Sequence, residues 1–339
     1  MTEHLKILSI GPGASLQDRG RPGWLEYGVS RGGAADLLAL AEGAALLRQS
    51  PDLAALELAT MGGEFESSTD TVIALTGAPM AASLDGTTLA WNASHHLPAG
   101  ARLQIGAVQK GCYGYLHVAG GFDGPAPLGA RSVHVAAGIG QPCKAGDTLP
   151  LGPATSTPTA GLGLTAENRF DGGTIRIVES LQTTLFPEAE RQRFENTEFR
   201  RASRGNRMGV ALDGDGASFQ PDGGRTVLSE VITPGDIQIT GDGTPYLLLS
   251  ECQTTGGYPR IGTALPCDLP KLAQAQPGTL LRFQFISQDD AIQAERHAAQ
   301  DRQTLPARCQ PLIRDPHKMT DLLSYQLISG AIAGDEDDL

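Results

Sequence analysis

The chain contains an internal repeat, which restricts the possible folds more than any single motif does. One stretch from Gly100 reads GARLQIGAVQKGCYGYLHVAGGF, and another from Gly235 reads GDIQITGDGTPYLLLSECQTTGGY. Each has a Gln-Ile strand after a glycine, then a Tyr-Leu strand and a Gly-Gly-aromatic turn, and each copy later ends on a strand that starts with glycine, at Gly146 and Gly278. Self-similarity of this kind indicates a duplicated structural unit. The sequence therefore predicts two related β domains.

The predicted domains cover residues 1–165 and 166–288, and a helical tail with an acidic end covers 289–339. The segment PATSTPTAGLGLTAE from Pro153 has the composition of an exposed linker. Short apolar runs bounded by Gly, Pro or Asp predict strands at residues 5–8, 71–75, 102–105, 113–118, 174–178, 236–239, 245–249 and 280–286. Helical spacing predicts helices at 34–47, 186–194, 289–300 and 320–329. A mainly β protein with a few helices is expected.

Composition and residue spacing make nucleic acid, a membrane and a bound metal unlikely for this protein. The net charge of −12 disfavours binding to the phosphate backbone of nucleic acids. No run of 18 apolar residues predicts a membrane span, and the five cysteines are scattered without a CxxC pair. The one close histidine pair, His95-His96, would point to opposite faces of a strand. We expect a cytoplasmic protein with no metal site, no nucleic-acid partner and no membrane contact.

A glycine-rich segment near the start, SLQDRGRPGWLEYGVSRGGAAD from Ser15, concentrates three arginines before a helix. Guanidinium groups match carboxylate or phosphate oxygens, and glycines let backbone N–H groups approach a ligand. An anion site is one interpretation. The other is that Arg19 and Arg21 pair with neighbouring carboxylates and only hold the loop in place.

The same segment contains Gly28-Val29-Ser30-Arg31-Gly32, a formal match to the GxSxG motif of serine hydrolases. That motif normally follows several alternating strands and helices, whereas here it lies near the start of a β-rich chain. The context argues against Ser30 as a hydrolase nucleophile. For His117 and His134 the expected role is that of hydrogen-bonded core histidines.

A second polar segment, SECQTTGGYPRIG from Ser250, runs from a strand into a glycine turn. Polar side chains and backbone amides on such a turn could orient an amide or carboxylate substrate, with Glu251 as a proton acceptor. The alternative is an ordinary hairpin turn with a packed tyrosine. No GxxxxGK[ST] sequence occurs, so any ATP would need a site other than a P-loop.

Several ordered motifs together resemble the biotin-dependent carboxyltransferase-like family, which includes allophanate hydrolase subunit 2, the C subunit of 5-oxoprolinase and the antagonist of the Kip sporulation inhibitor. The motifs are LQDRGRPGWLEYGVSRGGAAD at Leu16, LELATMGG at Leu56, ALTGA at Ala74, YLHVAGGF at Tyr115, LGARSV at Leu128, NRMGVALDG at Asn206, LSEVITPGDIQI at Leu228 and QTTGGYPRIG at Gln253. The resemblance implies two cyclophilin-like β-barrel domains.

The resemblance also implies a subunit that is active only in a hetero-complex. The expected function is that of the C subunit of an ATP-dependent 5-oxoprolinase, which acts with two partners, a LamB/YcsF-like subunit (called A) and a Kip-inhibitor-like subunit (called B), to open 5-oxo-L-proline to L-glutamate. ATP would be used by the complex, and no covalent biotin is expected here because the Ala-Met-Lys-Met turn of a biotin carrier is absent. Two alternatives are a carboxyltransferase component of the urea carboxylase or allophanate hydrolase type, using biotin on a partner, and a non-catalytic antagonist of a kinase-inhibitor protein.

The motif matches and the chemistry of the side chains together give the predicted site. The catalytic residues are predicted to be Asp18, Arg19 and Glu251. The residues predicted to bind the small-molecule substrate are Gln17, Arg21, Gly28, Ser30, Thr76, Arg207, Gln253, Thr254, Thr255, Gly256, Gly257, Tyr258 and Lys271. We expect the front arginine loop and the rear threonine-glycine turn to meet around one small anion.

Overall fold

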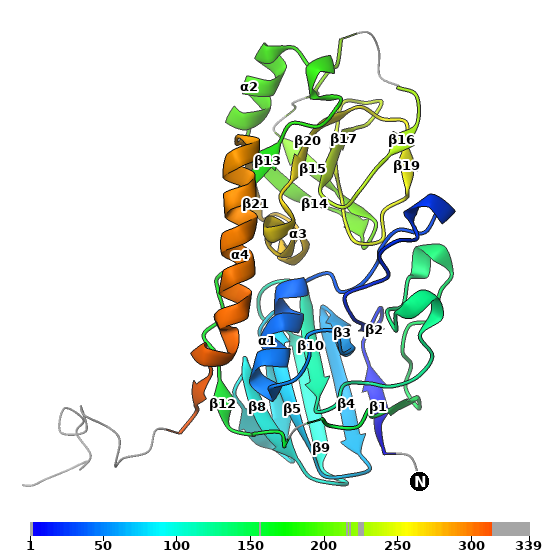
Figure 1. Ribbon diagram of the computed structural model, residues 1–339, viewed down its shortest axis with the longest axis vertical. Coiled ribbons are helices and arrows are strands. Elements are labelled where there is room, and N and C mark those ends of the chain that lie inside the picture. The colour runs from blue at the N-terminus through cyan, green and yellow to red at the C-terminus, as the bar shows by residue number, and fades with distance from the viewer. Residues whose placement is uncertain (1–2, 156, 215, 217, 223–226, 314–339) are drawn as a thin grey trace, which may run out of the picture.

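The first half of the chain folds into two β-sheets that share one core (Figure 1). The computed structural model describes residues 3–155, 157–214, 216, 218–222 and 227–313. One sheet has the order β11-β1-β4-β9-β6-β7, with β1 (His4–Ile10), β4 (Met61–Ser67), β6 (Met80–Leu84), β7 (Thr87–Leu89), β9 (Arg102–Val108) and β11 (Thr148–Pro150). The other has the order β2-β3-β10-β5-β8-β12-β22, with β2 (Ser15–Gln17), β3 (Ala55–Ala59), β5 (Thr71–Gly77), β8 (Ala93–Leu97), β10 (Tyr113–Val118), β12 (Leu162–Gly163) and β22 (Gln310–Pro311).

The second half is a closed seven-stranded barrel with the order β13-β20-β17-β18-β15-β14-β21. Its strands are β13 (Gly173–Val178), β14 (Phe199–Asn206), β15 (Gly209–Gly214), β17 (Asp236–Ile239), β18 (Pro245–Leu248), β20 (Arg260–Ala264) and β21 (Leu280–Phe285). A separate ribbon pairs β16 (Glu230–Val231) with β19 (Thr255–Gly256). The described helices are α1 (Leu37–Leu47), α2 (Glu188–Asn196), α3 (Leu269–Gln274) and α4 (Gln288–Arg308).

Alternating burial along the strands builds both cores. In β21, Leu281 and Phe283 point inward with almost no exposed surface, while the other residues of the strand are exposed or half-buried. Phe194, Phe199 and Phe283 form a cluster inside the barrel, with ring centroids 4.9–5.6 Å apart. Such aromatic pairs contribute stability beyond the area that they bury.

All eight strands expected from the sequence are present, which confirms a mainly β fold. The helix expected from residue 34 begins at Leu37, because Asp36 caps it by accepting a hydrogen bond from Ala39 N at 3.0 Å. The helix expected at 186–194 covers Glu188–Asn196 instead, since Phe186 is buried in the barrel core. Helix α4 continues past residue 300 to Arg308, and the helix expected at 320–329 lies outside the described residues.

The repeated stretches form corresponding strands but pair differently. The first copy supplies β9 and β10, which belong to different sheets, whereas the second supplies β17 and β18, which pair directly in the barrel. Likewise β1 pairs antiparallel with β11, whereas β13 pairs parallel with β21. The sequence repeat therefore predicted where the strands lie. It did not predict which strands pair, because the pairing differs between the two halves.

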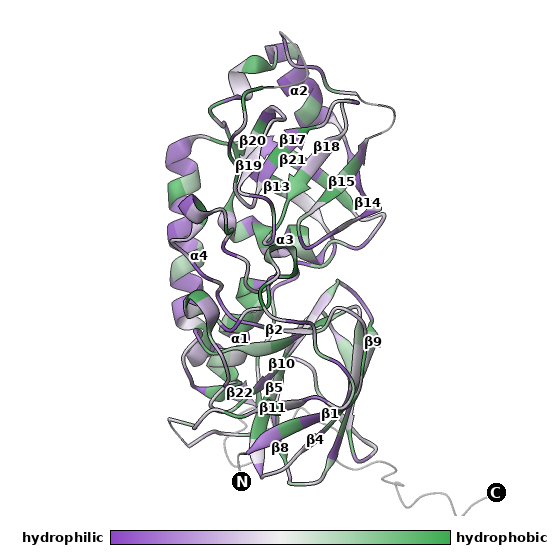
Figure 2. Cartoon of the chain, turned by 90° about the vertical axis from the view of Figure 1, so that its right-hand side faces the viewer, coloured by the Kyte–Doolittle hydropathy of each residue, from purple (hydrophilic) through white to green (hydrophobic). Residues whose placement is uncertain are grey.

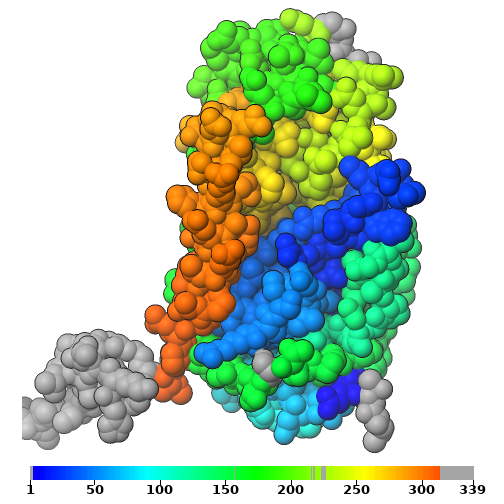
Figure 3. Space-filling model, in the orientation of Figure 1, coloured from blue at the N-terminus to red at the C-terminus, as the bar shows by residue number. Residues whose placement is uncertain are grey.

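The barrel lies on one end of the two-sheet half, and α4 runs along the side of both (Figures 1 and 3). Figure 2 shows hydrophobic residues along the strands and many hydrophilic residues along α4. After α4, β22 pairs with β12, so the tail returns to a sheet of the first half. Within the described residues, no helix combines the length and apolar character needed to cross a membrane.

Candidate functional site

A loop of residues 20–33, here called the cap loop, covers the junction between the two halves. Its ends are joined by a hydrogen bond from Arg21 N to Arg31 O at 2.8 Å. Gly20 and Gly33 both have left-handed backbone conformations, and a Cβ on Gly33 would lie 2.7 Å from Gly20 N. Only glycine allows this close crossing of the two ends. The loop reaches the barrel through Gly32 N, which donates to Ser250 O at 3.1 Å.

Asp18 holds the base of the cap loop. Its carboxylate accepts hydrogen bonds from Gly20 N at 2.8 Å, from Arg131 N at 2.7 Å and from the Ser132 hydroxyl. Asp18 N in turn donates to Ser132 Oγ at 2.9 Å. Because these donors occupy the carboxylate, the geometry favours a structural role over the predicted catalytic one.

Arg21 lies at the first end of the cap loop with only 1% of its surface exposed, because its side chain points into the protein. One nitrogen, Nη2, donates to Ser132 O, whereas Nε and Nη1 have no hydrogen-bond partner among the described residues. Burial lowers the pKa of this guanidinium, partly offset by the charges of Asp18 and Glu251. Unpaired buried donors are costly, so they mark a place where a polar ligand would be stabilised.

Ser30, His134 and Glu251 form a buried row next to Arg21. The Ser30 hydroxyl lies 2.8 Å from His134 Nε2, and His134 Nδ1 lies 3.7 Å from Glu251 Oε2. Gly32 fits between the groups, since a Cβ there would come within 2.9 Å of His134 Cδ2 and 3.3 Å of Arg21 Nη1. Burial lowers the pKa of His134. The charges of Arg21 and Arg207 also lower it, whereas the carboxylate of Glu251 raises it.

The hydrogen bonds of His134 decide what this row can do. Ala137 N donates to His134 Nδ1 at 3.2 Å, so the neutral ring carries its proton on Nε2 and donates to Ser30 Oγ. A serine nucleophile needs the opposite arrangement, with Nε2 accepting the hydroxyl proton. The geometry therefore makes Ser30 a polarised hydrogen-bond donor rather than an activated nucleophile, in agreement with the expectation from the β-rich context.

Arg207 connects this row to the first half of the molecule. It donates to Glu251 Oε1 from Nε at 2.5 Å, to Glu57 from Nη1, and to Gly33 O from Nη2 at 2.5 Å. Glu57 Oε2 accepts from the Tyr115 hydroxyl at 2.7 Å, and Tyr115 in turn accepts from Asp36 N at 2.8 Å. A continuous buried polar chain thus runs from Ser30 across both halves to the start of α1.

The structure brings together four of the predicted residues, namely Arg21, Ser30, Arg207 and Glu251. Arg19 instead is largely exposed and pairs with Asp52 at 3.1 Å. Lys271 donates to Thr174 O at 3.1 Å on α3, away from this row. Thr76 lies behind α1, where its hydroxyl donates to Ala39 O at 2.9 Å.

Several of the remaining predicted residues hold the backbone, whereas Tyr258 is 41% exposed. The Gln17 amide donates to Ser15 Oγ and Val133 O at 2.9 and 3.0 Å. Gly28 ends a short 3₁₀ turn, Leu25–Tyr27, with left-handed backbone. The turn from 253 to 258 pairs with residues 227–232: Thr254 O accepts from Ile232 N at 3.1 Å, and Gly257 O accepts from Val227 N at 3.0 Å.

The cap loop and the rear segment therefore meet at Ser250 and Glu251. These two residues follow β18 and precede the predicted turn at 253–258. Sequence reasoning expected His134 to be a hydrogen-bonded core histidine, which the structure confirms, but did not include it in the site. It lies 104 positions from Ser30 in the sequence, and no local motif links the two. Glu57 and Tyr115 were also missed as site residues, although both lie in motifs that carry the family resemblance.

Comparisons with known proteins agree with this architecture. The model of a family described as carboxyltransferase domain, subdomain A and B, matches residues 27–285. The chain is 33% identical over 296 residues to the C subunit of 5-oxoprolinase from Escherichia coli, covering 86% of this chain and 94% of that protein. It is 30% identical over 297 residues to the protein of the same name from Haemophilus influenzae, again covering 86% and 94%.

Larger proteins contain a region similar to this chain. Urea amidolyase of Lachancea kluyveri is 27% identical over 316 residues, which cover 85% of this chain and 17% of that protein. The crystal structure of the Kluyveromyces lactis urea amidolyase superimposes with a TM-score of 0.81 at 25% identity, covering 93% of this chain. The chain spans only 21% of that solved structure.

Proposed function

Since this chain belongs to the family of carboxyltransferase domains, subdomain A and B, we propose that it is the C subunit of an ATP-dependent 5-oxoprolinase. In this proposal it acts with a LamB/YcsF-like partner and a Kip-inhibitor-like partner to open 5-oxo-L-proline to L-glutamate, and ATP is used by the complex. The observation that carries the proposal is the match to the C subunit of the Escherichia coli 5-oxoprolinase along 94% of that protein's length. Urea amidolyase, by contrast, is matched over 17% of its length.

The buried row beneath the cap loop supports a role in binding the substrate. The Arg21 guanidinium has two nitrogens without a hydrogen-bond partner among the described residues near the His134 ring, which contacts the Ser30 hydroxyl, and Glu251 supplies a carboxylate within the same row. A small molecule with a carboxylate and an amide needs this set: a cation for the carboxylate, and a donor for the amide oxygen. The Arg21 nitrogens are enclosed, so we propose that the exposed part of the cap loop between Arg21 and Ser30 moves where the Kip-inhibitor-like partner joins the chain, while Arg21 and Ser30 stay in place.

Each residue of the row has a proposed role. Arg21 binds the substrate carboxylate, and Ser30 donates a hydrogen bond to the amide oxygen, oriented by His134 behind it. Glu251, held by Arg207 Nε at 2.5 Å, accepts a proton from the water that adds to the amide carbon, and that proton passes to the nitrogen as the C–N bond breaks. Electrostatic orientation is the main contribution expected from this chain.

The test is reconstitution of the complex from three purified proteins. The LamB/YcsF-like partner, the Kip-inhibitor-like partner and this chain together should form glutamate from 5-oxoproline only when ATP is present, and leaving out this chain should abolish turnover. Ser30→Ala should lower kcat by about tenfold or more, because it removes one hydrogen bond to a developing charge. Ser94→Ala is the matched control, since Ser94 is also buried but donates only to Thr159 O. Glutamate formation that needs no ATP, or no copy of this chain, would refute the proposal.

A carboxyltransferase role is the second candidate, favoured by the superposition on the urea amidolyase structure with a TM-score of 0.81. In that case the chain would transfer a carboxyl group from biotin on a partner protein. Adding a carrier protein that already bears carboxybiotin, together with urea, to the purified chain separates the two candidates. Carboxylation of urea without any glutamate formation would favour the second.

A further inference from the structure

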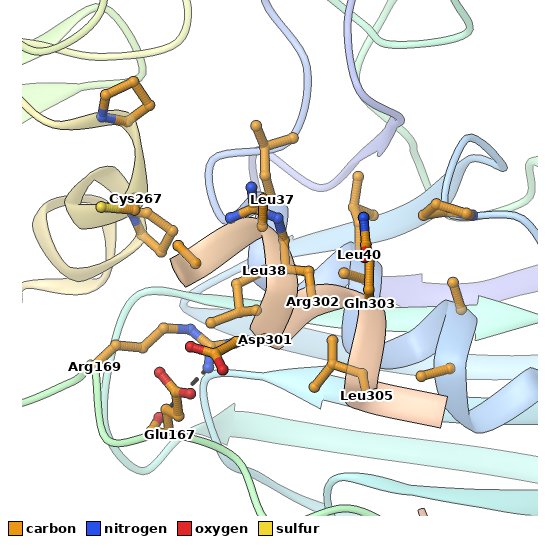
Figure 4. Close-up of a pocket in the computed structure, with 18 of the residues that line it drawn as sticks. Leu37, Leu38, Leu40, Glu167, Arg169, Cys267, Asp301, Arg302, Gln303 and Leu305 are labelled. Carbon is orange, nitrogen blue, oxygen red and sulfur yellow. Dashed lines mark hydrogen bonds between the residues drawn. The ribbon is translucent and has the colours of Figure 1, made fainter. Parts of the chain in front are cut away.

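A deep groove runs between α1 and α4 on the side of the molecule, and it is separate from the buried row beneath the cap loop. Its volume is about 1180 Å³, and its walls come from α1, α3, α4 and the segment that joins the two halves. We call it the α4 groove. Figure 4 shows Leu37, Leu38 and Leu40 of α1 gathered around the same space as Arg302 and Leu305 of α4.

The groove exists because α4 touches the rest of the molecule mainly near its ends. Of its 21 residues, only Ala291 and Leu305 are buried. Ala291 lies near the barrel end of α4, and Leu305 packs in a cluster with Leu46 and Leu47 of α1. Between these two points α4 turns Ala294, Ala298 and Ala299 toward the groove, and their small side chains leave it open.

The charge of the groove is opposite to that of the chain. Eight arginine or lysine residues line it against four carboxylates, although the whole chain has a net charge of −12. Two of the carboxylates already have partners: Asp268 pairs with Arg176 at 2.6 Å, and Glu167 with Arg308 at 3.8 Å. Arg19 and Arg169 also have partners just outside the lining, Asp52 for the first and Asp36 and Glu42 for the second, so the cations that matter for a ligand are those without such a partner.

Two of the arginines lack a carboxylate partner within the described residues. Neither Arg31 nor Arg302 has a carboxylate oxygen within 4.0 Å there, although both line the groove. The Arg31 Nε donates to the Arg19 carbonyl at 2.8 Å, which places two guanidinium-bearing residues side by side at one end. Burial and the neighbouring charge of Arg19 lower the pKa of Arg31. Like charges held together in this way are stabilised when an anion binds between them.

The apolar part of the groove indicates the rest of the ligand. The leucines and alanines of α1 form a continuous apolar wall opposite the alanines of α4. Small-molecule sites combine such walls with a few polar groups that fix orientation, and they commonly enclose about 300–1,000 Å³. The groove is large enough for a ligand that joins an apolar ring to several negative charges.

We propose that the α4 groove binds a nucleotide-like ligand, in which an apolar ring packs between α1 and α4 and a chain of phosphates contacts Arg31 and Arg302. A role for this site in ATP use rests on the proposed function. The binding itself does not, because it requires only this chain.

The experiment is isothermal titration calorimetry of the isolated full-length chain with ATP at about 0.15 M salt, where weak surface attraction is largely screened. Parallel titrations with tripolyphosphate and with adenosine separate the contribution of charge from that of the ring. We expect ATP to bind with a Kd below about 1 mM, and more tightly than either fragment.

Variants of α4 and of the cap loop test the location. Arg302→Ala and Arg31→Ala should each raise the Kd for ATP by about tenfold, the loss expected for one hydrogen bond to a charged group. Ala298→Trp should block the groove, and circular dichroism would show whether that variant keeps its fold. Arg296→Ala is the matched control, because Arg296 is on α4 but does not line the groove.

Several results would overturn the proposal. One such result is that ATP at about 1 mM does not bind. A second is that tripolyphosphate or adenosine binds as tightly as ATP, and a third is that Arg296→Ala loses as much affinity as the groove variants. If the isolated chain did not bind ATP, the complex could still form glutamate in an ATP-dependent reaction. The two proposals can therefore fail separately.

Discussion

His117 is a buried histidine that lies on β10 against α1. Its Nε2 is 2.8 Å from the Thr76 hydroxyl, and burial lowers its pKa to about 3. In the unfolded chain a histidine has a pKa of about 6.5. Below that pH the unfolded state takes up a proton that the folded state does not, so this stability is complete above pH 6.5 and is lost as the pH falls toward 3.

We therefore expect the unfolding free energy of the wild-type protein to fall more steeply below pH 6.5 than that of His117→Gln. The difference in slope should approach about 1.4 kcal/mol per pH unit, the value for one proton. Urea unfolding at pH 7, 6, 5 and 4.5 measures it. His96→Gln is the control, because His96 is exposed. Equal slopes for wild type and His117→Gln would contradict the assignment.

Gly43 shows how closely α1 approaches the sheet beneath it. A Cβ at this position would lie 2.3 Å from the His117 ring, so the backbone of α1 can reach β10 only without a side chain. Alanine is worth about 1 kcal/mol more than glycine in an exposed helix. Here we expect Gly43→Ala to lower the unfolding free energy by about 1–3 kcal/mol, since overpacking outweighs helix propensity.

Thermal and urea unfolding would measure the effect of Gly43→Ala. The control is Gln303→Ala, also in a helix but with its side chain in the open groove beside α4, for which a change within about 0.5 kcal/mol is expected. A Gly43→Ala protein more stable than the wild type would show that α1 can move away from β10.

At the scale of single residues, the sequence predicted Arg21 and two of the three residues of the buried row. Arg21, Ser30 and Glu251 stand in polar, glycine-rich segments that indicate ligand binding on chemistry alone. His134 could not be found in this way, because its partners are 104 and 117 positions away and only the fold brings them together. The exposed position of Arg19 also depends on the fold, since adjacent arginines in a loop point in different directions.

Secondary-structure elements were predictable where apolar residues alternate and were missed where glycines interrupt the pattern. Strand β4 is an example: Gly62 and Gly63 look like a turn, yet a Cβ on Gly62 would lie 2.3 Å from Ile105 O. The glycines are there because neighbouring backbones approach closely. Helix α3 was missed because it has only six residues and begins with a Leu-Pro pair.

Helix α3 joins the barrel to the first half through one side chain, that of Gln274. Its Oε1 accepts from Cys112 N and Tyr113 N at 2.8 and 3.0 Å, and its Nε2 donates to Tyr113 O and Asp36 Oδ2 at 2.8 and 2.9 Å. Gln274→Ala leaves these buried groups unpaired. We expect a loss of about 3 kcal/mol in unfolding free energy.

Chemical unfolding would measure this loss, and Gln276→Ala provides the comparison. Gln276 is two residues along the chain and makes one hydrogen bond, from Nε2 to Gly111 O at 2.8 Å. Its removal should cost about 1 kcal/mol or less. If both variants lose the same amount, the four bonds of Gln274 do not join the halves as the geometry indicates.

At the scale of the whole molecule, buried charges cross between the two halves. Arg169, in the segment that joins them, binds Asp36 at 2.6 Å and Glu42 at 2.7 Å on α1. Arg207 of the barrel half binds Glu57 of β3 together with Glu251. If one half unfolded alone, buried carboxylates in the other would lose their partners, which is strongly unfavourable. The sequence indicated two units. It did not indicate the ion pairs that join them, because the paired residues are up to 150 positions apart.

We therefore expect the wild-type protein to unfold in a single transition, with calorimetric and van't Hoff enthalpies equal. The double variant Arg207→Met with Gln274→Ala removes two of the connections and should give two separate transitions in differential scanning calorimetry. Arg282→Met is the control: its ion pair with Glu198 is exposed, and such pairs contribute about 0–1 kcal/mol. Two transitions in the wild-type protein, or one in the double variant, would show that the buried polar chain does not couple the halves.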